Sequence, residues 1–179
     1  KAKSVFSTPI AGVPKTVGKV LEVGDSITYS QAYGEWAFYG AGKTTEDIAA
    51  LSWMHGNSNG NDNGFILSLS GITAQSGIGW HDGKIDAILS NAQTNDAQMA
   101  VLMFNVASTN PPSDVAIVEQ RANQFLAKGI LPILSTIPPR NVANYDTNYG
   151  NPYNTAIRAL AQKLSLPLID YSQEILLRR

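Results

Sequence analysis

The sequence predicts an α/β domain in which a parallel sheet carries helices on both faces. Short apolar runs with strand character alternate with longer segments whose apolar residues recur at helical spacing. One run, "MAVLMFNV" at residues 99–106, is apolar almost throughout, as a strand buried on both faces should be. In sheets of this kind the functional site lies beyond the carboxyl ends of the strands.

The expected strands are the short apolar runs. They are Val20–Val23, Met99–Val106, Ile130–Ser135 and Leu166–Ile169. Apolar runs of this length are consistent with strands in the core of a sheet.

Helical periodicity fills the gaps between these strands. Apolar residues recur three and four positions apart in Asp82–Asn91, Ser113–Lys128 and Asn154–Leu164. Pro112, with Ser113 or Asp114, is expected to start the second of these helices. Gly129 stands where the C′ glycine that ends a helix belongs. Tyr171–Leu177 indicates the start of a further helix.

Length and composition predict one domain over residues 1–179, with 44% hydrophobic and 15% charged residues. Residues 43–76 are expected to form an insertion, with a short helix near Thr45 and an Asn/Gly-rich loop, "HGNSNGNDNG". The chain stops at a dibasic pair, Arg178-Arg179, soon after a helix begins. We therefore expect a domain that is truncated or nicked at its C-terminus.

Several functional classes are disfavoured by composition. The chain has no cysteine, which excludes disulfides, cysteine catalysis and zinc–thiolate sites. Its net charge of −1 does not favour nucleic acid as a partner. No apolar run approaches the roughly 20 residues that a membrane span needs. The sequence does not determine the cellular compartment, and it slightly favours a secreted or periplasmic location.

A Gly24-Asp25-Ser26 block follows the first expected strand directly. A serine in the turn between a strand and a helix has an exposed hydroxyl, and its backbone N–H points to where an oxyanion would form. Gly24 permits the tight turn, and Asp25 can bond backbone donors within it. The same three residues also make an ordinary surface turn, so the strand before them and the α/β pattern after them carry the argument.

With this block the sequence resembles the SGNH, or GDSL, hydrolase family of esterases and lipases. "SGIGW", with Gly79 before Trp80, is similar to the family's second block, and "ILPILSTIPPR" and "YNTAIRALAQKLSLPLIDYS" are similar to later segments. The resemblance implies a three-layer α/β/α fold with a flavodoxin-like sheet. It also implies Ser26 as the nucleophile and Gly79 as an oxyanion-hole residue, with Gly40-Ala41-Gly42 as a less favoured second block.

The third block of the family departs from its usual pattern here. The resemblance implies Gly-x-Asn-Asp after a buried strand, where the Asn side chain completes the oxyanion hole, but this chain reads "FNVASTNPP". An alignment on residue type favours Asn110, and Asn105 is the alternative. An alignment on the strand places Ala107 at the Asn position, which would remove one donor at a cost of about 3 kcal/mol in transition-state stabilisation.

The family's last block, Asp-x-x-His, is absent from these 179 residues. The base that should activate Ser26 is therefore expected beyond Arg179, either cut off or retained as a separate C-terminal fragment. His81, in "GWHDG", is a remote substitute, because adjacent turn residues seldom point at one centre. His55 opens the Asn/Gly-rich loop and is expected to be solvated.

The resemblance predicts a serine ester hydrolase that forms an acyl-enzyme on Ser26, uses no cofactor or metal, and acts on small acyl esters such as acetylated carbohydrates. The main alternative is a catalytically inactive binding protein with the same fold. A remote alternative is a phosphate-binding loop in "AFYGAGKT", residues 37–44, where bulky aromatic residues would crowd the phosphates. Arg140, beyond the third strand, either holds a substrate carboxylate or stabilises its loop. Asp170 is expected to cap the helix that follows it.

Overall fold

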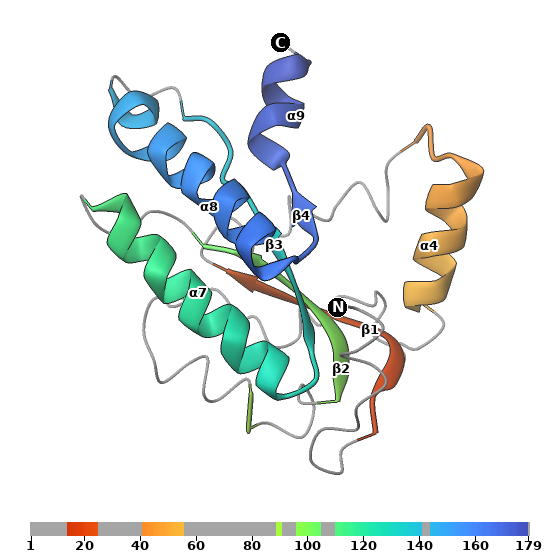
Figure 1. Cartoon of the computed structure of the whole chain (residues 1–179). Helices are drawn as coiled ribbons and strands as arrows, with labels where there is room; N and C mark the ends of the chain where they lie inside the picture. The colour runs from red at the N-terminus through yellow and green to blue at the C-terminus, as the bar shows by residue number, and fades with distance from the viewer. Residues whose placement is uncertain are drawn as a thin grey trace.

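The computed structural model describes residues 14–24, 41–55, 89–90, 96–104, 110–140 and 144–178. The described strands form one sheet in the order β1-β2-β3-β4, and each neighbouring pair is parallel. The strands are β1 (Thr16–Gly24), β2 (Ala97–Met103), β3 (Leu131–Ser135) and β4 (Leu168–Ile169). The predicted α/β fold with a parallel sheet is confirmed (Figure 1).

The first strand is longer than its apolar run predicts, because polar groups hold its beginning. The backbone N–H of Thr16 donates to the Asp96 carbonyl at 2.8 Å, and its hydroxyl donates to the Asp96 carboxylate at 2.6 Å. Gly18, at φ 79°, donates its N–H to the Gln98 side chain at 2.9 Å. An apolar run does not reveal such polar pairing, so the sequence predicts this strand only from Val20.

The strands end level with one another at the carboxyl edge of the sheet. Gly24 pairs with Met103 at the ends of β1 and β2, and Ser135 pairs with Ile169 at the ends of β3 and β4. The second strand stops at Met103, not at the predicted Val106, and residues 105 and 106 lie outside the described part. Segments that leave the four strands therefore start from one edge.

Two long helices, α7 (Pro111–Ala127) and α8 (Asn151–Leu164), lie side by side on one face of the sheet (Figure 1). Each buries the apolar stripe that its periodicity predicts, with Val118 and Phe125 on α7 and Ile157 on α8 almost fully buried. Burying one such side chain contributes about 1.5–3 kcal/mol. Successive residues of β2, Ala100 to Met103, are buried although their side chains alternate between faces, so both faces of this strand are covered.

The ends of α7 follow from its sequence. Asn110 occupies the N-cap, and Pro111 and Pro112 lie in the first turn, where a missing N–H costs nothing. The helix therefore starts slightly before the expected Ser113. Gly129 follows the C-cap with φ 67°, as predicted for a C′ glycine.

Three shorter helical segments complete the described fold. Helix α4 (Thr45–His55) is the short helix expected near Thr45, and α9 (Tyr171–Leu177) begins at the predicted Tyr171. A turn of π-helix, η3 (Asp146–Gly150), leads into α8. Of the helix predicted at residues 82–91, only 89 and 90 are described, and both are helical. Most of the expected insertion at 43–76 also lies outside the described residues.

The strand order is compatible with the flavodoxin-like sheet that the family resemblance implies. That sheet has the order 2-1-3-4-5, and the four described strands follow one another across the sheet in chain order, as four neighbouring strands of that order do. Within the described parts of the chain, no helix has both the length and the apolar character to cross a bilayer.

Candidate functional site

The carboxyl edge of the sheet is the place where the sequence predicts the site. Gly24 is buried there as the last residue of β1, beside the end of β2. Asp25 and Ser26 follow it directly along the chain but lie outside the described residues. The other predicted site residues outside the described part are Gly79, His81, Asn105 and Ala107. The nucleophile and the oxyanion glycine stay predictions.

Asn110, the favoured oxyanion asparagine, is described, and it lies where α7 begins after β2. Its carbonyl accepts the N–H groups of Ser113 and Asp114 at 3.0 and 3.2 Å. Its side chain is exposed and makes no capping bond to the helix. Because α7 runs back from the end of a parallel strand, Asn110 belongs to the same edge as Gly24. Its role in an oxyanion hole stays a prediction.

The end of β2 is anchored to α8 by a buried tyrosine. The Tyr153 hydroxyl donates to the Phe104 carbonyl at 2.8 Å, and both residues are almost fully buried. A lone carbonyl at this depth would cost about 1–3 kcal/mol if it lacked a donor. The bond therefore fixes the point at which the chain leaves the sheet toward Asn105.

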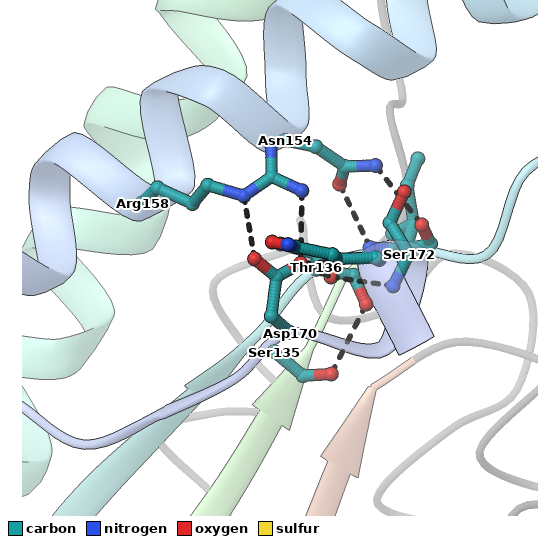
Figure 2. Close-up of polar contacts among 8 residues, drawn as sticks. Ser135, Thr136, Asn154, Arg158, Asp170 and Ser172 are labelled. Atoms are coloured by element: carbon teal, nitrogen blue, oxygen red, sulfur yellow. Dashed lines mark hydrogen bonds and ion pairs between the residues drawn. The ribbon is translucent and has the colours of Figure 1, made fainter. Parts of the chain in front are cut away.

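A polar network joins β3, α8 and α9 at the same edge (Figure 2). Arg158, on α8, points at Asp170 and donates Nε to Oδ2 at 2.6 Å and Nη2 to Oδ1 at 2.8 Å. Thr136 donates its hydroxyl to Asp170 Oδ1 at 3.1 Å and accepts the Ser172 N–H at 2.9 Å. Asp170 also accepts the Gln173 N–H at 3.3 Å. The carboxylate is therefore engaged by three residues.

These contacts determine the electrostatics of the pair. Hydrogen bonds from Arg158 are the main reason that the pKa of Asp170 lies below its ordinary value, and those from Gln173 and Thr136 act in the same direction. The same partnership raises the pKa of Arg158. Asp170 is thus held ionised and fully partnered, which suits a positioning role and not that of a general base.

Asn154 ties the start of α8 to the end of β3 (Figure 2). Its Oδ1 accepts the Ile137 N–H at 2.9 Å, and its Nδ2 donates to the Ile137 carbonyl at 3.0 Å. The side chain is buried. One residue thereby satisfies both backbone groups of a residue that has just left the sheet.

The sequence predicts only one member of this network. Asp170 caps α9 as expected, through the Gln173 N–H. The role of Arg158 was missed, as was that of Asn154, although Asn154 stands one helical turn before Ile157 on the buried stripe of α8. A polar residue on an apolar stripe was the available indication, because a buried amide needs partners.

Arg140 lies in the loop between β3 and α8. Its backbone N–H donates to Asp146 Oδ1 at 2.9 Å, and its guanidinium lies over the Tyr145 ring, 4.6 Å from the centroid. The loop-stabilising interpretation of Arg140 is therefore supported at its backbone. Arg140 as a residue is half-buried, and its guanidinium has no ion pair among the described residues.

The described end of the "AFYGAGKT" segment caps a helix. Thr44 donates its hydroxyl to the Asp47 carboxylate at 2.8 Å, while the Asp47 N–H donates back to that hydroxyl at 3.1 Å. The backbone N–H of Thr44 also donates to this carboxylate at 2.8 Å, and these bonds hold the pKa of Asp47 below its ordinary value. This capping box occupies the hydroxyl that a phosphate loop would use for magnesium.

The described residues contain no group of three or more His, Cys, Asp or Glu side chains that could hold a metal ion. Comparison with known proteins gave no assignment: no protein-family model matches the chain, and no curated protein matches it significantly.

Proposed function

We propose that the protein is a serine ester hydrolase that acts through an acyl-enzyme on Ser26. The observation that carries the proposal is the position of Gly24. It is the last residue of β1, which pairs in parallel with β2, and it lies next to the end of β2, so the Asp25-Ser26 pair follows at the carboxyl edge, where such sheets bind their ligands. The resemblance of the Gly-Asp-Ser block to SGNH hydrolases supplies the chemistry.

In the proposed reaction the Ser26 hydroxyl attacks the ester carbonyl. Backbone N–H groups of Ser26 and Gly79, with one Asn side chain, stabilise the oxyanion. A histidine outside these 179 residues accepts the serine proton and returns it to the leaving alcohol. Water then hydrolyses the acyl-enzyme, so no cofactor is consumed. Small acyl esters, including acetylated carbohydrates, are the proposed substrates by analogy with the fold.

The test is the intact mass of the native protein, measured under denaturing conditions after the folded sample has reacted with a fluorophosphonate. We expect one adduct, located on the peptide that contains Ser26, together with a polypeptide segment that carries an Asp-x-x-His block. Ser26→Ala should abolish the adduct and lower turnover of nitrophenyl acetate by about 10³-fold or more. Ser113→Ala, at an exposed serine of α7, is the matched control and should change neither.

The second candidate is a binding protein of the same fold that does not catalyse. The irregular third block, "FNVASTNPP", favours it. Its signature in the same experiment is a folded protein whose Ser26 stays unmodified and whose turnover equals that of Ser26→Ala. That result would remove the hydrolase proposal.

A separate pair of variants tests the oxyanion asparagine. If Asn110 donates to the oxyanion, Asn110→Ala should lower kcat by about 10²–10³-fold with little change in KM. Asn105→Ala is the comparison, and the larger loss identifies the donor. Equal, small effects of both variants would mean that neither asparagine side chain donates to the oxyanion, as the alignment that places Ala107 at the Asn position implies.

A further inference from the structure

Arg140 is a half-buried residue, and the described part of the chain offers its guanidinium an aromatic ring and no ion pair with a carboxylate. Its Cζ atom lies over the Tyr145 ring, 4.6 Å from the centroid. Partly burying a charge is costly unless it is paired, and cation–π attraction offsets only part of that cost. Cation–π contact with a ring uses none of the five N–H donors of a guanidinium as hydrogen bonds to a carboxylate. A guanidinium can bind a carboxylate with two parallel hydrogen bonds.

The neighbouring acid does not neutralise Arg140. The Asp146 Oδ1 atom accepts the backbone N–H of Arg140 at 2.9 Å, and no ion pair joins Asp146 to the guanidinium. Gly150 packs against the same oxygen so closely that a Cβ atom there would lie 3.1 Å from it. The Asp146 carboxylate thus binds the backbone N–H of Arg140 and holds that residue in place.

The loop that carries Arg140 is shaped by unusual backbone. Asn144 adopts φ 63°, and residues 146–150 form a turn of π-helix. Such conformations cost free energy and concentrate at functional sites. The Tyr145 and Tyr149 rings lie 5.9 Å apart and are tilted by 50°, so the ring under the Arg140 cation has a second aromatic ring as its neighbour.

The topology places this loop at the carboxyl edge of the sheet. It leaves the end of β3 at Ser135 and enters α8 at Asn151. Gly24 ends β1 at the same edge. We infer that Arg140, with Tyr145 and Tyr149, forms a subsite for a carboxylate group of the ester substrate. This inference rests on the proposed esterase function and narrows its substrates to anionic esters, with the carboxylate on the sugar or on the acyl part.

The test measures binding, so it does not require turnover. The Nε–Hε signal of Arg140, assigned by its loss in Arg140→Gln, is followed by NMR during titration with two carboxylates. Glucuronate carries its charge on a sugar, and monomethyl succinate carries it on an acyl chain. Methyl glucuronate and dimethyl succinate are the matched neutral probes. We expect one carboxylate to shift the Arg140 signal and its neutral ester to leave it unchanged.

Two variants make the test specific. Arg140→Gln should weaken binding of the effective carboxylate about tenfold or more, since a charged hydrogen-bonding pair is lost. Arg140→Lys keeps the positive charge but loses the paired N–H donors of the guanidinium, so it should weaken binding less than Arg140→Gln does. Asp146→Asn keeps the Oδ1 acceptor, removes a nearby negative charge and should tighten binding.

Equal affinity of the wild type and Arg140→Gln for both carboxylates would overturn the subsite, as would the absence of any shift. Failure of the esterase proposal looks different, because Ser26 would then resist the fluorophosphonate while the Arg140 signal still responded to a carboxylate. If the native protein turns over nitrophenyl esters, Arg140→Gln should raise KM for the monosuccinate ester and leave that for the acetate unchanged.

Discussion

At the scale of single residues, Asp170 contributes to stability only while it is ionised. Its folded-state pKa lies below the ordinary value of 3.8, mainly because Arg158 donates two hydrogen bonds to it. A lowered folded pKa stabilises the native state at pH values above the unfolded pKa, and this contribution is lost as the pH falls through the folded pKa. The contribution of the pair is therefore complete at neutral pH and disappears in strong acid.

Asp170→Asn should lower the free energy of unfolding by about 1.5–3 kcal/mol at pH 7, since it removes the negative charge and replaces one of the two oxygens that accept from Arg158 with an NH2 donor. The difference from wild type should shrink as the pH falls below 3.8, because Asp170 is then protonated in the unfolded chain first and in the folded protein only at lower pH. Urea denaturation at several pH values measures both effects. Glu119→Gln is the control, because its pair with Lys163 is largely exposed and should matter by less than about 1 kcal/mol. A difference that does not vary with pH would contradict the account of Asp170.

At the scale of elements, the junction of β3 and α8 depends on one amide. Asn154→Ala would leave the N–H and the carbonyl of Ile137 without their partner in a buried position. We expect a loss of about 2–4 kcal/mol in the free energy of unfolding, measured by chemical denaturation. Thr155→Ala, at the adjacent exposed position, should change it by less than about 0.5 kcal/mol. Similar small effects of the two variants would mean that water replaces the lost bonds.

The elements that the sequence predicts well are those whose pattern is local. The stripe of α7, its C′ Gly129 and the start of α9 follow from spacing and capping alone. The early start of β1 and the network around Asp170 depend on partners distant in sequence, such as Asp96 for Thr16, and no local pattern reports them. In the candidate site, the sequence correctly places Gly24 at a strand end, whereas Arg158 and Asn154 gain their roles only when α8 packs on the sheet.

At the scale of the whole molecule, the described parts differ in how deeply they are buried. Strands β1, β2 and β3 and the inner faces of α7 and α8 share one apolar core. The first half of α4 contributes little to it, since Ile48 is 58% exposed and its neighbours in residues 45–50 are exposed or half-buried. Local opening is cheapest where few apolar groups are buried.

Native-state hydrogen exchange should therefore separate two classes of amide. Those of Leu102 in β2 and Leu134 in β3 should exchange only through global unfolding, because opening either strand exposes the core. The Ile48 amide, bonded to the Thr44 carbonyl at 3.0 Å, should exchange through local opening at a much lower free energy. Mild denaturant should accelerate exchange at Leu102 and Leu134 steeply and at Ile48 hardly at all, since local opening exposes little surface. The Val118 amide in α7 is the helical control and should follow the strands, because its side chain is almost fully buried. Equal protection of Ile48 and Val118 would mean that α4 is part of the same cooperative unit as the core.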